Sequence, residues 1–364
     1  MSDHGSGASS ESDVEPVVRA SAAAGERIAV VVNGNAKSVN DEVISTLDQI
    51  LKGGDLFVSR RLEEGQEIAR TLVSRGDGTV LTGGGDGTFT VMVTEVVREA
   101  RRQGKPLPRF GLLKLGTGNA LAWVVGASKA RRKGKGLSVD IQRLREDAGS
   151  RTIRLVEVED TIAPFAGFGV DAVVLADYAH VKQRLSKTPL KPIASGPLSY
   201  AIGSVTRSIP SYFIRKVPHC RVINLGEEAW RVGPRGRLMQ PGFGRGDVLY
   251  EGPARVASVG TIPYFGFGFR FFPFAEERSD RMHLRVSCIN PVDFVKNFPA
   301  IWRGEYEDPN STFDYLVDHV AIEMDPPTAF QIGGDPHGER QRVEMRLSPT
   351  PIQLVDFYAP PSAS

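Results

Sequence analysis

The stretch Gly83-Gly84-Gly85-Asp86-Gly87-Thr88 holds the residues best suited to chemistry. Consecutive glycines let a backbone turn tightly and approach a ligand closely, because no Cβ is in the way. The stretch follows an apolar run, 79–82, and precedes a run with helical spacing, 89–102, so its amides favour an anion. Asp86 is the odd member, since a purely phosphate-binding turn gains nothing from a negative charge. A carboxylate that binds Mg²⁺ or takes a proton from an attacking hydroxyl would explain it, which indicates phosphoryl transfer.

Two further turns strengthen this interpretation. Glycine-rich turns between a strand and a helix are common in α/β folds, and many bind nothing. Here, Asn33-Gly34-Asn35-Ala36-Lys37-Ser38 follows the apolar run 27–32, and Gly116-Thr117-Gly118-Asn119 follows the apolar run 110–115. Ligands of parallel sheets lie beyond the carboxyl ends of the strands. Three such turns at three strand ends therefore predict a shared binding site.

Alternating strands and helices must position these turns. The strand-like and helix-like runs follow one another in the order 27–32, 39–51, 55–59, 63–74, 79–82, 89–102, 110–115 and 120–125. The strand-like runs are continuously apolar, and the helix-like runs repeat apolar residues every three or four positions. This alternation predicts an α/β domain with a parallel sheet covered on both faces.

The pattern changes after about residue 150. Short strand-like runs, punctuated by glycine and proline, occur at 152–158, 221–225, 255–259 and 282–288. They predict an antiparallel β domain, and a chain of 364 residues is long enough for two domains. The expected divisions are a disordered tail at 1–25, an α/β domain at 26–150, a β-rich domain at 151–358 and a tail at 359–364.

Two segments leave alternatives open. Residues 261–274 hold seven Phe or Tyr separated by small residues, which suit either a protein core or a groove for an acyl chain. Residues 128–138 include Arg131-Arg132-Lys133-Gly134-Lys135. They are either a solvated connection or a contact for nucleotide phosphates or anionic lipid head groups.

Composition narrows the class of protein. A formal net charge of +2 implies no general attraction to nucleic acid. Cys220 and Cys288 lie far apart without metal-ligand spacing, so we expect two buried thiols in a reducing compartment. No run approaches the roughly 18 apolar residues of a membrane span, and the N-terminus lacks the features of a secretory signal. We expect a cytoplasmic protein that can touch a membrane surface; the sequence leaves its oligomeric state open.

In order and spacing, Asn33–Ser38, Gly83–Thr88 and Gly116–Ala122 resemble the diacylglycerol kinase catalytic-domain superfamily, which includes bacterial lipid kinases and sphingosine kinases. Further on, 166–172 resembles the family's Gly-Phe-Gly-x-Asp-Ala segment. Residues 273–284 resemble its Pro-x-Ala…Asp-Gly-x-Leu stretch, with Arg281 in place of the usual glycine. The resemblance covers roughly residues 27–357.

The resemblance implies an N-terminal domain related to NAD kinases and phosphofructokinases, and a C-terminal β-sandwich that holds a lipid. It implies transfer of the ATP γ-phosphate, with Mg²⁺, to a hydroxyl of a diacylglycerol- or sphingoid-type lipid. Asp86 lies where the family has its Mg²⁺-linked or proton-accepting carboxylate, and Asp171 matches an aspartate near the substrate head group. A helix-capping turn is the alternative for Asp171. The implied phosphate and nucleotide contacts are Asn33, Gly83, Gly84, Gly85, Gly87, Thr88, Gly116, Thr117, Gly118 and Asn119.

Two acids of the family pattern are replaced in this chain. Ala120 stands where many bacterial diacylglycerol kinases have Asp, a form closer to sphingosine kinases. In the segment that matches the family's Asp-Gly-Glu, Gly333 replaces the Asp proposed as general base in some bacterial members, and Asp335 replaces the Glu. Either Asp86 takes the proton, or Asp335 reaches the site, or the chain is catalytically weak. An NAD kinase and a non-catalytic lipid- or nucleotide-binding protein are the alternative functions.

Overall fold

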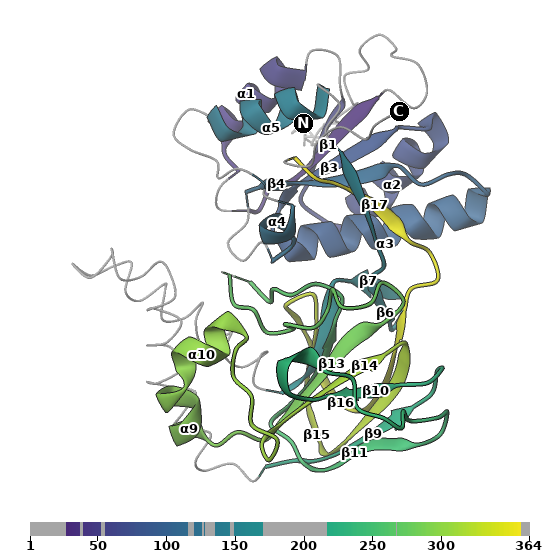
Figure 1. Ribbon diagram of the computed structural model, residues 1–364. Coiled ribbons are helices and arrows are strands. Elements are labelled where there is room, and N and C mark those ends of the chain that lie inside the picture. Colours follow the sequence, from purple (N-terminus) through teal and green to yellow (C-terminus); the bar gives the residue numbers. More distant parts are fainter. Residues whose placement is uncertain are drawn as a thin grey trace, which may run out of the picture.

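The computed structural model describes residues 27–36, 39–51, 55–115, 120–125, 127, 135–145, 149–169, 217–266 and 268–357. This part of the chain forms two lobes, each built on one sheet (Figure 1). The upper lobe in the figure contains a largely parallel sheet with helices, and the lower lobe contains an antiparallel sheet. Both domain types expected from the sequence are therefore confirmed.

The first sheet has six strands in the order β2-β1-β3-β4-β17-β5. Its first four strands are parallel and carry continuous apolar runs, because helices cover this kind of sheet. The elements of this lobe are β1 (Ile28–Asn33), α1 (Asp41–Leu51), β2 (Asp55–Ser59), α2 (Leu62–Arg75), β3 (Thr79–Gly84), α3 (Asp86–Gln103), β4 (Arg109–Lys114), α4 (Ala120–Val124), α5 (Lys135–Arg145), β5 (Ser150–Ile153) and β17 (Ile352–Val355).

The glycine-rich stretch is divided between a strand and a helix. β3 extends to Gly84, beyond the expected 79–82, and α3 begins at Asp86 instead of residue 89. Pairing with the neighbouring strands explains the longer strand, because Gly83 pairs with Val32 of β1 and Gly84 with Lys114 of β4. Glycine is required at both positions, because a Cβ on Gly83 would lie 2.7 Å from Cγ1 of Val32 and a Cβ on Gly84 would collide with Thr88. Only Gly85, the N-cap of α3, lies between the two elements.

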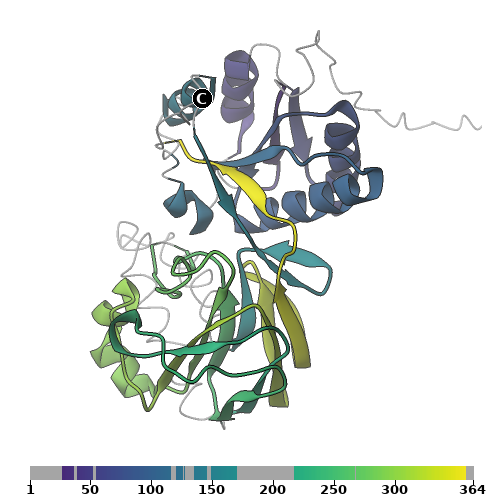
Figure 2. The ribbon, with the colours of Figure 1, turned by 45° about the vertical axis from the view of Figure 1, so that its right-hand side comes forward.

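The last strand of the chain returns to the first sheet. β17 lies between β4 and β5, parallel to β4 and antiparallel to β5. Figure 2 shows this yellow strand rising into the upper lobe beside the teal strand β5. The range expected for the second domain, 151–358, therefore includes β17 and most of β5, which belong to the first sheet. Local sequence cannot reveal a four-residue strand that pairs with residues about 200 positions away.

The second sheet has eleven strands. Its order is β10-β14-β13-β12-β8-β15-β16-β6-β7, and β9 pairs with both β15 and β11. The bounds are β6 (Val156–Val158), β7 (Thr161–Ala163), β8 (Phe165–Gly169), β9 (His219–Asn224), β10 (Trp230–Val232), β11 (Val248–Pro253), β12 (Val256–Gly260), β13 (Met282–Ser287), β14 (Thr312–Val317), β15 (His319–Ile332) and β16 (Asp335–Leu347), with the short helices η3 (Pro234–Gly236), α9 (Pro291–Lys296) and α10 (Phe298–Arg303). Alternate residues of these strands point into one shared core.

The aromatic segment 261–274 packs against the core of the first lobe. Phe265, Phe269 and Phe272 are buried and join the same apolar cluster as β1, β3 and β4. Phe165 of β8 stacks on Phe265 at a centroid distance of 4.4 Å. Of the two alternatives for this segment, these three rings support the core.

Helix α3 joins the lobes through one of its faces. The hydroxyl of Thr94 accepts a hydrogen bond from the Ile162 amide at 2.9 Å and donates one to the Ile162 carbonyl at 3.3 Å. One turn further on, Arg98 donates to the carbonyl oxygen of Asp160 at 3.2 Å. Both partners belong to β7 or the turn before it, so the helix that begins beside the glycine turn also holds the second domain.

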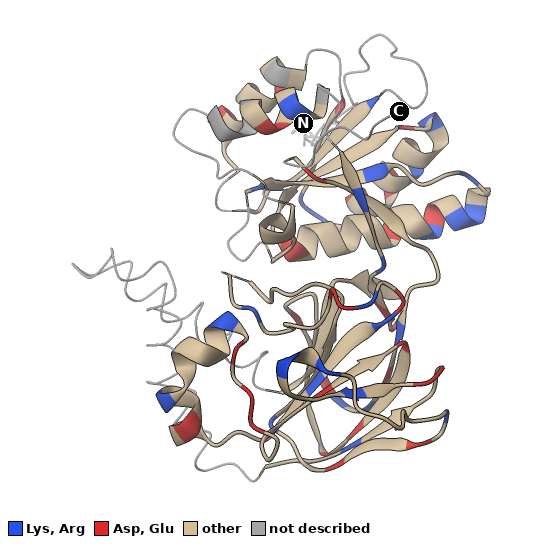
Figure 3. Cartoon of the chain, viewed as in Figure 1, with Lys and Arg blue, Asp and Glu red and all other residues tan. Residues whose placement is uncertain are grey.

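Charges of both signs are interspersed over the two lobes in the view of Figure 3. The last turns of α3 pair Arg98 with Glu95 and Arg102 with Glu99, and these basic residues favourably face the negative end of the helix dipole. Cys220 is buried and Cys288 is partly buried, and both are free thiols. No helix in the described ranges is long and apolar enough to cross a membrane. The two expected tails and residues 131–134 lie outside the described residues.

Candidate active site

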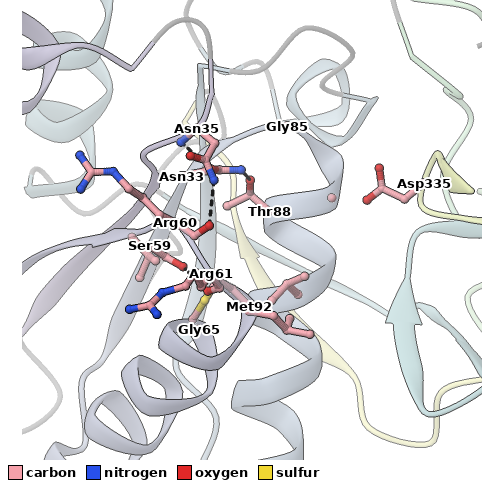
Figure 4. A pocket seen from close by; sticks show the side chains of 14 residues that line it. Asn33, Asn35, Ser59, Arg60, Arg61, Gly65, Gly85, Thr88, Met92 and Asp335 are labelled. Atoms are coloured by element: carbon pink, nitrogen blue, oxygen red, sulfur yellow. Dashed lines mark hydrogen bonds between the residues drawn. The ribbon is translucent and has the colours of Figure 1, made fainter. Parts of the chain in front are cut away.

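A pocket of about 410 Å³ opens beyond the carboxyl ends of β1 and β2, beside the first turns of α2 and α3. Figure 4 shows residues of the first lobe on one side and Asp335 of the second lobe across the start of α3. Residues of two of the expected turns, Asn33 with Asn35 and Gly85 with Gly87 and Thr88, line this edge of the sheet, as the parallel topology requires. The lining residues are Val31, Asn33, Asn35, Ser59, Arg60, Arg61, Leu62, Gly65, Gly85, Gly87, Thr88, Val91, Met92 and Asp335.

The N-terminus of α3 forms the floor of this pocket. Its N-cap is Gly85, and no side chain from the described residues caps the helix. The first amides of an uncapped helix have no intrahelical acceptor and, with the helix dipole, favour an anion. Asn33 closes one side, since its Nδ2 donates to Thr88 Oγ1 at 3.4 Å and its Oδ1 accepts from the Asn35 amide at 2.9 Å.

Asp86 faces away from the pocket lining. Its Oδ2 accepts the Ala120 amide at 2.9 Å and its Oδ1 accepts the Leu121 amide at 3.4 Å. Burial raises the pKa of Asp86 to about 6, although the two amide hydrogen bonds oppose this change and the nearby charge of Asp335 reinforces it. The carboxylate therefore ties the first turn of α3 to the first turn of α4.

Asp335 reaches the first turn of α3 from the second lobe. It begins β16, directly after the two-residue turn that follows Ile332 of β15. A Cβ added to Gly87 would collide with Oδ2 of Asp335, so glycine permits this close approach. Burial raises the pKa of Asp335, and His337 partly opposes the change. Within the described chain, no donor hydrogen-bonds to this carboxylate.

The two carboxylates considered in the sequence analysis therefore converge. Asp86 and Asp335 both lie at the first turn of α3, close enough for their charges to interact. Gly333, which replaces an expected acid, has a left-handed φ of 59° and lies against Thr90, whose hydroxyl would be 2.7 Å from an added Cβ. The hairpin turn thus lies directly on α3.

The positions of the remaining expected residues differ. Asn33, Gly85, Gly87 and Thr88 line the pocket, whereas Gly83 and Gly84 are buried in β3 behind it. Gly116, Thr117, Gly118, Asn119 and Asp171 lie outside the described residues. The ligand contacts expected for all of these positions stay predictions.

Sequence reasoning missed the arginine pair after β2. The Arg60 side chain passes over Gly34, and the Arg60 carbonyl accepts the Asn35 side-chain amide at 2.8 Å. Glu64 accepts the Arg60 amide at 2.6 Å, so α2 has its own anionic cap. The sequence did contain a signal for this pair. Two arginines directly after a strand of a parallel sheet must lie at the same edge of the sheet as the other expected turns.

A family match agrees with this geometry. The sequence of residues 27–151 matches the family described as "Diacylglycerol kinase catalytic domain". The matched range holds the whole pocket lining except Asp335, which the second lobe supplies.

Solved structures described as putative diacylglycerol kinases show the same fold. A putative diacylglycerol kinase from Bacillus anthracis str. Sterne is similar with a TM-score of 0.58 and 13% identity, over 92% of this chain and 99% of that chain. A further structure described as a putative diacylglycerol kinase from the same organism gives a TM-score of 0.57 and 13% identity, over 91% and 97% of the two chains. An NAD kinase from Archaeoglobus fulgidus in complex with ATP gives a TM-score of 0.45 and 11% identity, over 91% and 94%. No curated protein sequence matches this chain.

Proposed function

We propose that this protein is a lipid kinase that transfers the γ-phosphate of ATP to a hydroxyl of a diacylglycerol- or sphingoid-type lipid. One observation carries the proposal: a carboxylate of the second lobe, Asp335, faces the N-terminus of α3, which no side chain of the described residues caps, in the range that matches the diacylglycerol kinase catalytic domain. In this proposal the phosphate donor and the proton acceptor meet at the same helical turn.

The pocket suits the phosphate donor on its first-lobe side. The amides at the start of α3, with Asn33 and Thr88, offer hydrogen-bond donors to phosphate oxygens. Arg60 and Arg61 add positive charge, while Leu62, Gly65 and Met92 provide apolar surface for a nucleoside. Phosphoryl transfer depends mainly on positioning and electrostatic stabilisation, which are the properties that this side supplies. On the resemblance alone, Gly83, Gly84 and the turn Gly116–Asn119 complete the nucleotide site in this proposal.

The acceptor side depends on Asp335. A general base must be free to accept a proton, and Asp335 has both oxygens available within the described chain, whereas both oxygens of Asp86 accept backbone amides. We therefore assign proton acceptance from the lipid hydroxyl to Asp335. Asp86 holds the first turn of α4 in place. The family pattern further assigns Asp171 to the lipid head group.

The residues present also fit Mg²⁺. This ion is usually held by one or two carboxylates, with phosphates and water as its other ligands, so a dedicated protein cage is not needed. Among the described residues no group of three or more His, Cys, Asp or Glu could hold a metal. On the resemblance alone, Asp86 would hold the ion: it faces away from the pocket lining, but each of its oxygens keeps lone pairs beyond the amide that it accepts. Bound Mg²⁺ neutralises charge on the transferring phosphates.

Activity towards separate acceptors tests the proposal. The protein is incubated with γ-labelled ATP and Mg²⁺, in parallel with diacylglycerols, sphingoid bases or NAD. Label in one of the lipids is the expected result. Label in NAD alone would establish the alternative enzyme, and ATP binding without label in any acceptor would identify a binding protein. Adding the lipid in vesicles and sedimenting them tests the accompanying proposal of peripheral membrane contact.

A further inference from the structure

A buried glutamine lies beside the turn that carries Asp335. Gln331 is in β15 and its side chain is fully buried. Its Oε1 accepts the amide of Gly334 at 2.7 Å. Gly334 is the second residue of the β15–β16 turn, so this hydrogen bond fixes the peptide between Gly333 and Gly334, one residue before Asp335.

Neighbouring features fix the rest of the turn. The Gly333 amide donates to the carbonyl of Phe165 in β8 at 2.9 Å. Gly333 and Gly334 have φ values of 59° and 91°, which side chains rarely adopt. Pro336 follows Asp335 and restricts its backbone to extended conformations. Among these restraints the hydrogen bond from the Gly334 amide to Gln331 depends on a side chain, so a substitution can remove it while the backbone stays the same.

A buried amide can also serve only to satisfy polar groups in a core. Two observations give Gln331 a more specific role. Its oxygen accepts the amide of Gly334, the residue directly before Asp335, and the Asp335 carboxylate is packed so closely on Gly87 that a single Cβ would displace it. A small rotation of the Gly334 peptide would therefore move the carboxylate along or away from the first turn of α3.

We propose that Gln331 is a positioning residue, which holds Asp335 over the start of α3 in the geometry that phosphoryl transfer needs. The proposal rests on the function proposed above. Gln331 touches neither nucleotide nor acceptor; it acts through the Gly334 amide. A displacement of about 1 Å at a reacting group can cost on the order of 100-fold in rate, so losing this restraint should lower kcat.

Four variants test this role. Gln331→Met keeps the side-chain length without a strong acceptor, Gln331→Asn keeps the amide but is too short to reach Gly334, and Gln331→Glu keeps an acceptor oxygen. The matched control is Asn224→Leu, which removes another buried amide of the second lobe. Asn224 donates to the carbonyls of Glu227 and Phe243, in a loop that does not line the pocket.

The expected result is a loss of roughly 10- to 100-fold in kcat for Gln331→Met and Gln331→Asn, with KM for ATP unchanged, and partial rescue in Gln331→Glu. Asn224→Leu should lose stability but keep kcat. Hydrogen exchange adds a readout without substrate, because the Gly334 amide should exchange faster in the Met and Asn variants than in the wild type. If Gln331→Met does not fold, the test rests on the kcat of Gln331→Asn and on the rate of hydrogen exchange at its Gly334 amide.

The outcomes separate the two proposals. If the wild type phosphorylates no lipid, the proposed function fails and the positioning role fails with it. If the wild type is active and the Gln331 variants keep its kcat, only the positioning role is overturned. Equal losses of kcat in Asn224→Leu and Gln331→Met would also overturn it, because general destabilisation would then explain the effect.

Discussion

Replacing Asp335 by Asn is the most direct test of the candidate active site. The substitution preserves the shape of the side chain and removes its ability to take a proton. Loss of a general base commonly costs on the order of 10²–10⁴ in rate, which corresponds to about 3–5 kcal/mol of transition-state stabilisation. Since the amides of α3 and the pocket arginines are unchanged, we expect kcat to fall by this factor while KM for ATP stays the same.

The fold should tolerate this change. Within the described chain Asp335 accepts no hydrogen bond, and burial raises its pKa, so its charge does not stabilise the native state. Removing that charge also relieves repulsion on Asp86, whose pKa should fall. The measurements are steady-state kinetics with labelled ATP and the lipid acceptor, and urea unfolding at the same pH. An Asp335→Asn protein with wild-type kcat would refute the assignment of the proton acceptor, and one with greatly reduced stability would refute the structural reasoning.

Three further substitutions probe the same surroundings. The raised pKa of Asp86, about 6, means that the native state binds this proton more tightly than the unfolded chain, so this group lowers wild-type stability as pH rises from about 4 to 6. Urea unfolding across this range should show Asp86→Asn gaining about 3 kcal/mol relative to the wild type, and a relative loss would contradict the shift. Gly87→Ala favours the helix by up to about 1 kcal/mol but displaces Asp335, so kcat should fall without a loss of thermal stability; unchanged kcat would show that the close approach is dispensable. In the second lobe, Asp314 accepts two hydrogen bonds from Arg285, and this guanidinium holds the pKa of Asp314 well below its usual range. Asp314→Asn should therefore destabilise the protein by about 3–5 kcal/mol at pH 7, and by less as the pH falls below 4. Thermal unfolding at several pH values measures this difference. A constant difference across pH would exclude that ion pair as the cause.

The elements of the first lobe could be predicted because their signals are local. Continuous apolar strands and helical repeats gave the order of strands and helices, and the parallel topology then placed Asn33, Gly85 and Thr88 at one edge. The boundary between β3 and α3 was harder, because glycines carry no periodic signal. Pairing of Gly83 with Val32 and of Gly84 with Lys114 extends that strand to Gly84.

The position of Asp335 shows what local sequence cannot contain. Its match to a family motif suggested a role, but its distance from Asp86 depends on how the β15–β16 hairpin packs on α3. That packing depends on Thr94 and on two glycines with left-handed φ. The hydrogen bonds of Asp86 to α4 are likewise tertiary, so its position facing away from the pocket lining could not be anticipated.

The return of β17 to the first sheet has a consequence for folding during synthesis. β4 and β5 have no strand between them until residues 352–355 have left the ribosome. By then the whole second lobe has been translated, since it lies in the chain between β5 and β17. Domains generally fold as units from the N-terminus, but here the first lobe cannot complete its sheet first. β17 is synthesised last, so the edge of β4 that pairs with it stays unpaired until then.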